Sequence, residues 1–210
     1  MGRPKEHDER TAAALLDAAE RIAEQNGLAA LSVRRVANEV GTTTRAVYSL
    51  FGAKEGLVGA LGARAFDLLG ASVAALPTTD DPAADLVRAG LVFRGFANRH
   101  PAFFRLAVQH IDLSPESVHA FAGAAFRALD VLRERVSRLG DSAHLGHRPL
   151  DAAVLEFHAL CEGLATLEAR CSIPDADADR YWRDALSALV RGWERDDVWP
   201  TQVPSVTNAP

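Results

Sequence analysis

Apolar residues recur along most of the chain three and four positions apart, which is the spacing of one face of an α-helix. No segment alternates convincingly between apolar and polar residues, so the pattern predicts an all-α fold. We expect nine helices, at about residues 8–25, 33–40, 44–51, 54–76, 83–99, 101–110, 115–139, 150–169 and 177–195. Residues 77–82, with the sequence PTTDDP, form the clearest interruption between a small first group and a larger bundle.

The segment 32–57, SVRRVANEVGTTTRAVYSLFGAKEGL, predicts two short helices joined by a tight turn. Val33, Val36, Ala37 and Val40 form one apolar stripe on the first of them. Gly41 follows, and glycine readily adopts the left-handed backbone conformation that ends a helix. Two short helices across a sharp turn are typical of a helix-turn-helix unit that enters the major groove of DNA.

The second short helix separates its residues by chemistry. We expect Thr43 to cap its N-terminus, while Val47, Leu50 and Phe51 face inward. The outward face then carries four side chains able to form hydrogen bonds, namely Thr44, Arg45, Tyr48 and Ser49. Hydroxyl and guanidinium groups on an exposed helix are suited to reading base edges and phosphates.

The charge distribution is compatible with DNA binding although the net charge is −5. Residues 1–56 hold eight Lys or Arg and eight Asp or Glu, so the remainder of the chain carries the whole excess of acid. Between Ser32 and Lys54 there are four basic residues and one acidic residue. A local basic patch attracts phosphate at short range, because salt screens charges beyond about 8–10 Å.

Composition narrows the class of protein. The chain has 210 residues, of which 48% are apolar, so it can form a large packed core. It has no uninterrupted apolar run near the roughly 20 residues of a membrane span, and its charged N-terminus lacks an export signal. Two cysteines form no disulfide framework, which agrees with a reducing cytoplasm. We expect no cofactor, no metal and no membrane partner.

The first 60 residues resemble the TetR (tetracycline-repressor) family of bacterial transcriptional regulators. The resemblance rests on Asn26-Gly27, the segments 31–34 and 36–41, and the pattern Ala46-Val47-Tyr48-x-x-Phe51-x-x-Lys54-Glu55-x-Leu57. It implies an all-helical homodimer with a DNA-reading domain at residues 1–56 and a ligand-sensing, dimer-forming domain at residues 57–199. Residues 200–210, which contain three prolines, are expected to be a disordered tail.

The resemblance and the local chemistry together assign the DNA contacts. Base reading falls to Arg34, Thr44, Arg45 and Ser49, and Arg45 is suited to guanine because it offers two donors. Phosphate contacts fall to Ser32, Thr43, Tyr48 and Lys54, of which Ser32 and Thr43 also cap their helices. Gly52-Ala53 replaces the family's usual pair before Lys54, and this departure weakens the cap of the following helix.

Aromatic residues at helical spacing in the second domain mark either its core or a ligand chamber. The candidate ligand-binding residues are Phe66, Phe93, Phe96, Phe103, Phe104, His110, Phe126, His158, Cys161 and Glu162. His158 and Glu162 lie one helical turn apart, a spacing typical of a simple side-chain contact and also open to a metal. Glu162 stands where one TetR subgroup has a histidine, so no role of that histidine is carried over.

Small residues on the last two long helices suit a dimer interface. Ala159, Gly163 and Ala165 on one helix, and Leu186, Leu189, Val190 and Trp193 on the other, are expected to form a four-helix contact. A two-fold dimer requires a palindromic operator with half-sites one DNA turn apart, or a multiple of it.

The interpretation is a repressor that a small, largely apolar ligand releases from its operator. Activation in place of repression remains open. An enzyme is disfavoured, since the chain has no catalytic triad order, phosphate loop or Cys/His metal spacing. A helical carrier that no longer binds DNA is the other alternative.

Overall fold

The computed structural model describes residues 4–108, 115–141, 145–146 and 148–193, and within them it confirms the all-α prediction. These residues form nine α-helices and one short 3-10 helix, with no strand. The elements are α1 (Pro4–Asn26), η1 (Leu28–Ala30), α2 (Val33–Val40), α3 (Thr44–Phe51), α4 (Lys54–Ala74), α5 (Pro82–Arg99), α6 (Pro101–Val108), α7 (Pro115–Asp141), α8 (Leu150–Ala169) and α9 (Asp175–Trp193).

The helix boundaries differ from the sequence pattern mainly at their ends. α1 begins at Pro4, four residues earlier than expected, because proline suits the first turn of a helix. The 3-10 turn was not predicted; it follows Gly27, whose φ of 79° is readily accessible to glycine. α4 ends at Ala74, two residues early. The expected helix ends at residues 110 and 195 and the tail at 200–210 lie outside the described residues.

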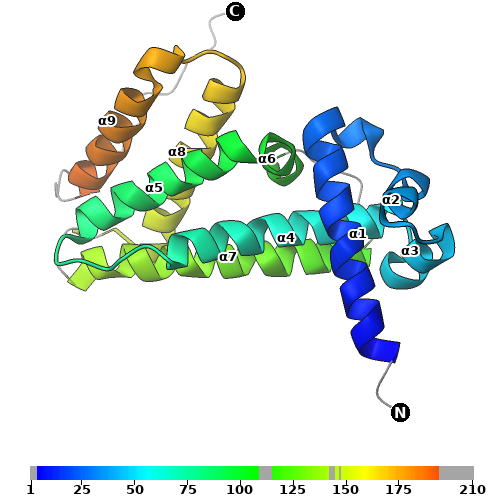
Figure 1. The fold of residues 1–210 in the computed structure, drawn as a ribbon. Helices are drawn as coiled ribbons and strands as arrows, with labels where there is room; N and C mark the ends of the chain where they lie inside the picture. Colours follow the sequence, from blue (N-terminus) through cyan, green and yellow to red (C-terminus); the bar gives the residue numbers. More distant parts are fainter. Residues whose placement is uncertain (1–3, 109–114, 142–144, 147, 194–210) are drawn as a thin grey trace, which may run out of the picture.

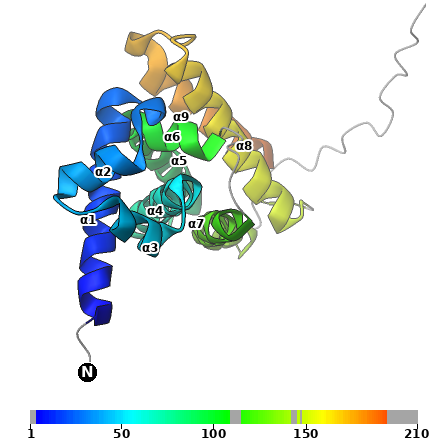
Figure 2. The ribbon, with the colours of Figure 1, turned by 90° about the vertical axis from the view of Figure 1, so that its right-hand side faces the viewer.

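Two long helices form the axis of the molecule. α4 and α7 lie side by side along most of their length, with α1 crossing them at one end (Figure 1). α2 and α3 lie at that same end, whereas α5, α8 and α9 surround the other end (Figure 1). Seen along this axis, α1 and α8 lie on opposite sides of α4 and α7 (Figure 2). α4 therefore runs from the helix-turn-helix unit into the bundle.

Buried apolar residues form two clusters, one at each end of that axis. The first joins α1–α3 and the N-terminal half of α4, and it also contains Phe96, Phe103 and Leu106 from α5 and α6. The second joins α5, α7, α8 and α9 around Trp182 and Trp193. Because α6 contributes to the first cluster, the N-terminal head is physically attached to the bundle by more than α4.

α4 is long and apolar enough to cross a membrane by composition alone. In the structure it is a core helix, with eight buried residues packed inside the protein. Its two charged residues beyond the first turn pair with neighbouring helices. Arg64 lies 2.6 Å from Asp17 of α1, and Asp67 lies 2.8 Å from Arg127 of α7.

A polar cluster joins three helices of the bundle. The Glu168 carboxylate of α8 accepts hydrogen bonds from Arg94 and Asn98 of α5 and from the Trp182 indole of α9, the last at 2.7 Å. Burial by itself would raise the pKa of Glu168, but these donors outweigh it and lower the pKa. The carboxylate therefore stays ionised and holds α5, α8 and α9 together.

Candidate DNA-reading surface and ligand chamber

Local sequence positions the two short helices. The Ser32 hydroxyl accepts a hydrogen bond from the backbone N–H of Arg35 at 3.2 Å, and the Thr43 hydroxyl accepts one from Ala46 at 3.2 Å. Both predicted N-caps are thus present. Gly41 ends α2 in the left-handed conformation, with φ 73° and ψ 29°. The turn that sets the angle between α2 and α3 is therefore encoded within residues 32–43.

The side chains expected to touch DNA all lie at the surface of the protomer. The exposed residues are Ser32, Arg34, Thr43, Thr44, Arg45, Tyr48, Ser49 and Lys54. Tyr48, an aromatic residue, is 52% exposed, whereas Val47 on the opposite face of α3 is fully buried. The apolar face of α3 packs on the head, and its polar face is left open to a partner.

Not every basic residue of the head is available to DNA. The Arg35 guanidinium donates to the Asn26 side chain at the end of α1, so it braces the head. Lys54 begins α4 and is exposed beside the end of α3. Ala53 provides no side-chain cap for α4, as the sequence predicted, so backbone N–H groups there remain open to an anion.

An apolar cavity of about 120 Å³ lies between α4, α5, α7 and α8. α4 contributes Phe66, Leu69, Gly70 and Val73 to its wall, and the opposite wall includes Phe157 of α8. A second hollow of about 50 Å³ adjoins it and shares Phe66, Leu69, Phe93 and His158. The two hollows together form one chamber, called the α4 chamber below.

The structure divides the candidate ligand residues. Phe66, Phe93, His158 and Cys161 line the main cavity, and Phe96, Phe104 and Glu162 border the second hollow. Two others differ from the prediction. Phe103 is fully buried in the core of the head, and Phe126 is 67% exposed on α7. His110 lies outside the described residues. The spacing of aromatic residues alone did not distinguish core, cavity and surface.

The α7 side of the chamber was missed by sequence reasoning. Ala125, Ala128, Leu129 and Leu132 line it from that helix. Small and aliphatic residues on a long amphipathic helix carry no distinctive ligand signal, because the same pattern is required for ordinary packing. Only the tertiary structure places this stripe against α4.

Polar side chains in the chamber wall are few. The Nε2 atom of His158 lies 3.3 Å from a carboxylate oxygen of Glu162, which matches an i,i+4 contact on one helix. Cys161 is buried, and burial raises the pKa of its thiol to about 12, so it remains a neutral thiol. Cys161 and Cys171 are both free.

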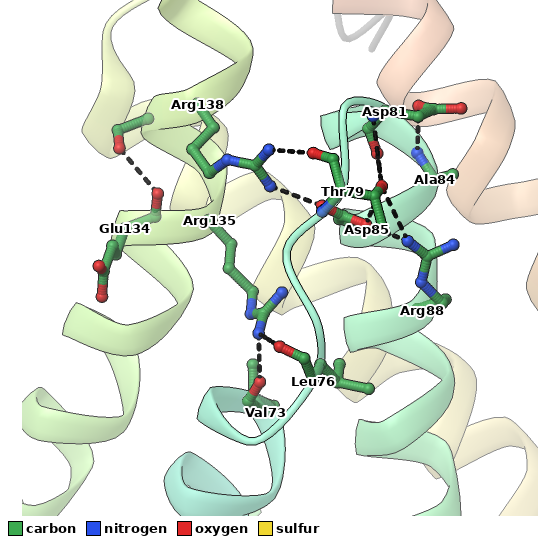
Figure 3. A network of polar contacts seen from close by, with 11 residues as sticks. Val73, Leu76, Thr79, Asp81, Ala84, Asp85, Arg88, Glu134, Arg135 and Arg138 are labelled. Carbon is green, nitrogen blue, oxygen red and sulfur yellow. Dashed lines mark hydrogen bonds and ion pairs between the residues drawn. The ribbon is translucent and has the colours of Figure 1, made fainter.

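The C-terminal end of α4 is held by charged residues of α7. Arg135, which is buried, donates from one nitrogen to the carbonyls of Val73 and Leu76, each at 2.7 Å (Figure 3). Arg138 donates to the Thr79 carbonyl and, at 2.6 Å, to the Asp85 carboxylate (Figure 3). These contacts fix the end of α4 and the loop that follows it. We call them the α4 anchor.

Asp85 is the centre of the α4 anchor. Its fully buried carboxylate accepts from the backbone N–H and the hydroxyl of Thr79, both at 2.8 Å, and pairs with Arg88 and Arg138. Burial opposes ionisation, but the Thr79 and Arg138 hydrogen bonds and the Arg88 charge hold the pKa of Asp85 well below its ordinary value. No sequence motif marked this residue.

A helix-turn-helix head with an open polar face, joined by one long helix to a bundle with an internal apolar chamber, defines a ligand-sensing DNA-binding regulator. Comparisons with known proteins agree with this class. Residues 15–61 match the model of bacterial regulatory proteins of the tetR family, and residues 86–189 match that of the tetracyclin repressor-like C-terminal domain.

Relatives and solved structures support the assignment. The chain is 30% identical over 179 residues to the uncharacterized HTH-type transcriptional regulator Rv0681 of Mycobacterium tuberculosis, covering 82% of this chain and 76% of that protein. The chain belongs to the TetR family of bacterial transcriptional regulators. Such proteins bind DNA and a small-molecule effector and act as dimers.

Two solved structures share the fold. A protein of unknown function from Rhodococcus sp. RHA1 has a TM-score of 0.75 at 23% identity, covering 88% of this chain and 96% of that one. RolR in complex with the ligand resorcinol has a TM-score of 0.67 at 17% identity, covering 91% and 96% respectively. The predicted nine-helix TetR-like architecture is therefore confirmed for the described residues.

Proposed function

We propose that this regulator is a cytoplasmic, homodimeric repressor that leaves a palindromic operator when a small, largely apolar ligand fills the α4 chamber. The observation that carries the proposal is that one helix serves both sites. α4 lines the chamber with Phe66, Leu69 and Val73, and it begins at Lys54, two residues after α3. A ligand that alters the position of α4 also alters the position of the reading helix.

Direct base contacts are assigned to Arg34, Thr44, Arg45 and Ser49, and phosphate contacts to Ser32, Thr43, Tyr48 and Lys54. Their shared exposure on one end of the head supports the assignment. Arg35 is excluded from the set because its guanidinium is bound to Asn26.

The dimer interface is assigned to an exposed stripe on α8. Leu155 and Leu167 are 66% and 45% exposed, and Ala159 and Gly163 lie between them at intervals of four residues. Tyr181, which is 45% exposed, extends the surface onto α9. Large exposed apolar side chains beside small ones are suited to close helix packing with a second copy.

Four residues that the sequence analysis placed in the interface lie elsewhere. Leu186, Val190 and Trp193 of α9 are buried within the protomer, as is Ala165 of α8. They pack in the second apolar cluster, so they support the protomer and are not free to contact a partner.

The α4 anchor determines which end of α4 can move. Because Arg135 holds the Val73 and Leu76 carbonyls, the C-terminal end of α4 is fixed to α7. A ligand beside Phe66 and Leu69 therefore shifts mainly the N-terminal half, which carries the head. A tenfold loss of DNA affinity requires about 1.4 kcal/mol of preference for the displaced state.

The ligand class follows from the chamber wall, which is almost entirely apolar. The similar fold of RolR, whose structure contains resorcinol, supports a small ligand at a comparable place in this family. Binding of such a ligand is expected to weaken operator binding.

DNA binding is tested by fluorescence anisotropy with DNA from upstream of the chain's own gene, at several salt concentrations. A regulator loses affinity steeply as salt rises, whereas a carrier that has lost DNA binding shows no complex at any salt. Arg45→Ala is expected to cost about 1–3 kcal/mol on the specific site and to relax the choice at one base pair per half-site. Lys54→Ala is expected to weaken all sequences alike and to reduce the salt slope by about one per contact.

The interface is tested with Gly163→Arg. A side chain at Gly163 meets nothing within 4 Å in the protomer, so the variant is expected to fold. Sedimentation should show a monomer, and operator affinity should fall because the two half-sites are no longer bound together. A dimer of unchanged affinity would place the interface elsewhere.

A further inference from the structure

We infer that the effector is a neutral molecule of one ring, with a hydroxyl group at one end that donates a hydrogen bond to the His158–Glu162 pair. This inference deepens the proposed function and rests on it, since it specifies what the α4 chamber binds. Three properties of the chamber carry it: its size, the absence of cations from its wall, and the position of its polar residues.

The size limits the ligand to a single ring. The main cavity has a volume of about 120 Å³, and the adjoining hollow adds about 50 Å³ behind Phe66 and Phe93. An apolar protein cavity of roughly 150 Å³ is sufficient to bind benzene. The main cavity therefore fits one six-membered ring, and the smaller hollow fits a short alkyl substituent.

The wall excludes an anionic ligand. Among the described residues, no Lys or Arg lines either hollow. A carboxylate taken from water into this wall would have no positive partner, and an unpaired buried charge is strongly unfavourable. Glu162 borders the smaller hollow and would repel an anion further.

The polar groups are placed at one edge of the chamber. The side chains of His158 and Glu162 are 30% and 42% exposed, whereas Phe157 and Cys161 on the same helix are almost fully buried. The His158–Glu162 pair therefore lies where the chamber meets solvent. A ligand that matches this wall has its apolar ring inside and its polar group at the edge.

The chemistry of the pair selects a hydrogen-bond donor. The Glu162 carboxylate accepts only, and it lies 3.3 Å from His158 Nε2. When that nitrogen carries the proton, Nδ1 of the neutral imidazole is an acceptor. A hydroxyl group can donate to either acceptor. A ligand ammonium is disfavoured, because a half-exposed carboxylate does not offset the loss of its hydration.

The binding test uses the full chain and three probes with one ring each: phenol, toluene and benzoate. Titration calorimetry should show phenol binding, toluene binding about fivefold weaker because it lacks the hydroxyl, and no binding of benzoate. Equal affinity for phenol and toluene, or tighter binding of benzoate than of phenol, would overturn the inference. Benzylamine is the fourth probe, and tighter binding of it would show that the site prefers a cation.

Two variants locate the site. His158→Phe retains a ring but removes the acceptor, so it should abolish the preference for phenol over toluene. His119→Phe, at an exposed position on α7, is the matched control and should retain that preference. Ala125→Leu should weaken phenol and toluene together, because its larger side chain fills the cavity that Ala125 lines. A preference for phenol that survives both His158→Phe and Ala125→Leu would place binding outside the chamber.

The inference and the proposed function fail in different ways. Phenol that binds but leaves DNA affinity unchanged would contradict the proposed coupling through α4 and leave the ligand class intact. Release from DNA by a larger or anionic molecule, with no binding of phenol, would contradict the ligand class and leave the proposed function intact.

Discussion

The replacement Asp85→Asn tests how strongly the α4 anchor stabilises the fold. The fully buried carboxylate of Asp85 accepts two hydrogen bonds from Thr79 and pairs with two arginines. Asparagine keeps the shape, but it loses the charge and directs N–H groups at donors. Breaking a buried pair costs about 3–5 kcal/mol. Arg138 and Arg88 are 28% and 40% exposed and can rehydrate, so we expect a loss near 3 kcal/mol at pH 7, the low end of that range.

The pH dependence gives this prediction a sign. The pKa of Asp85 is lowered in the folded protein, so the unfolded chain binds the proton more readily. The stabilisation is therefore fully present above the unfolded value of about 3.9, and it is lost as the pH falls below that value. Between pH 4 and pH 3 the wild-type protein should lose up to about 1.4 kcal/mol through this group, whereas Asp85→Asn should not.

Urea unfolding followed by circular dichroism at pH 7, 5, 4 and 3 measures both effects. The difference between wild type and Asp85→Asn should be largest at pH 7 and 5 and should narrow at pH 3. Asp80→Asn, at an exposed carboxylate of the same loop, is the matched control and should change stability little. Parallel curves for wild type and Asp85→Asn, or a loss below about 1 kcal/mol at pH 7, would refute the reasoning.

Two further substitutions test packing that the structure makes specific. Gly56→Ala would place a Cβ atom 1.8 Å from the Phe51 carbonyl oxygen, so the junction of α3 and α4 must shift. We expect a loss of about 1–3 kcal/mol in urea unfolding together with weaker operator binding, whereas Gly123→Ala, which meets only the end of an arginine side chain, should be neutral or stabilising. Trp182→Phe removes the indole donor to a buried carboxylate and leaves a small void, which should cost about 2 kcal/mol; unchanged stability would show that the bond is dispensable.

The DNA-reading head could be predicted from the sequence because its geometry is set by neighbouring residues. The apolar stripe at Val33, Val36 and Ala37, the left-handed Gly41 and the cap at Thr43 all act within one or two turns. The backbone conformation, the hydrogen bonds of the caps and the exposure of α3 follow from such local chemistry. All of these features are present in the structure.

The ligand chamber could not be predicted in the same way. Helical spacing shows that Phe66, Phe103 and Phe126 are apolar positions, but it does not show what each one meets. Tertiary packing places Phe66 in the cavity wall, Phe103 in the core of the head and Phe126 at the surface.

The sequence by itself thus determined where the helices form and which short segment reads DNA, because these depend on contacts between residues close in the chain. Only the tertiary structure decided that α7 closes the chamber against α4, that Arg135 anchors the end of α4, and that Trp193 packs inside the protomer. Each of these depends on residues far apart in sequence. Their proximity is fixed by how whole helices pack together.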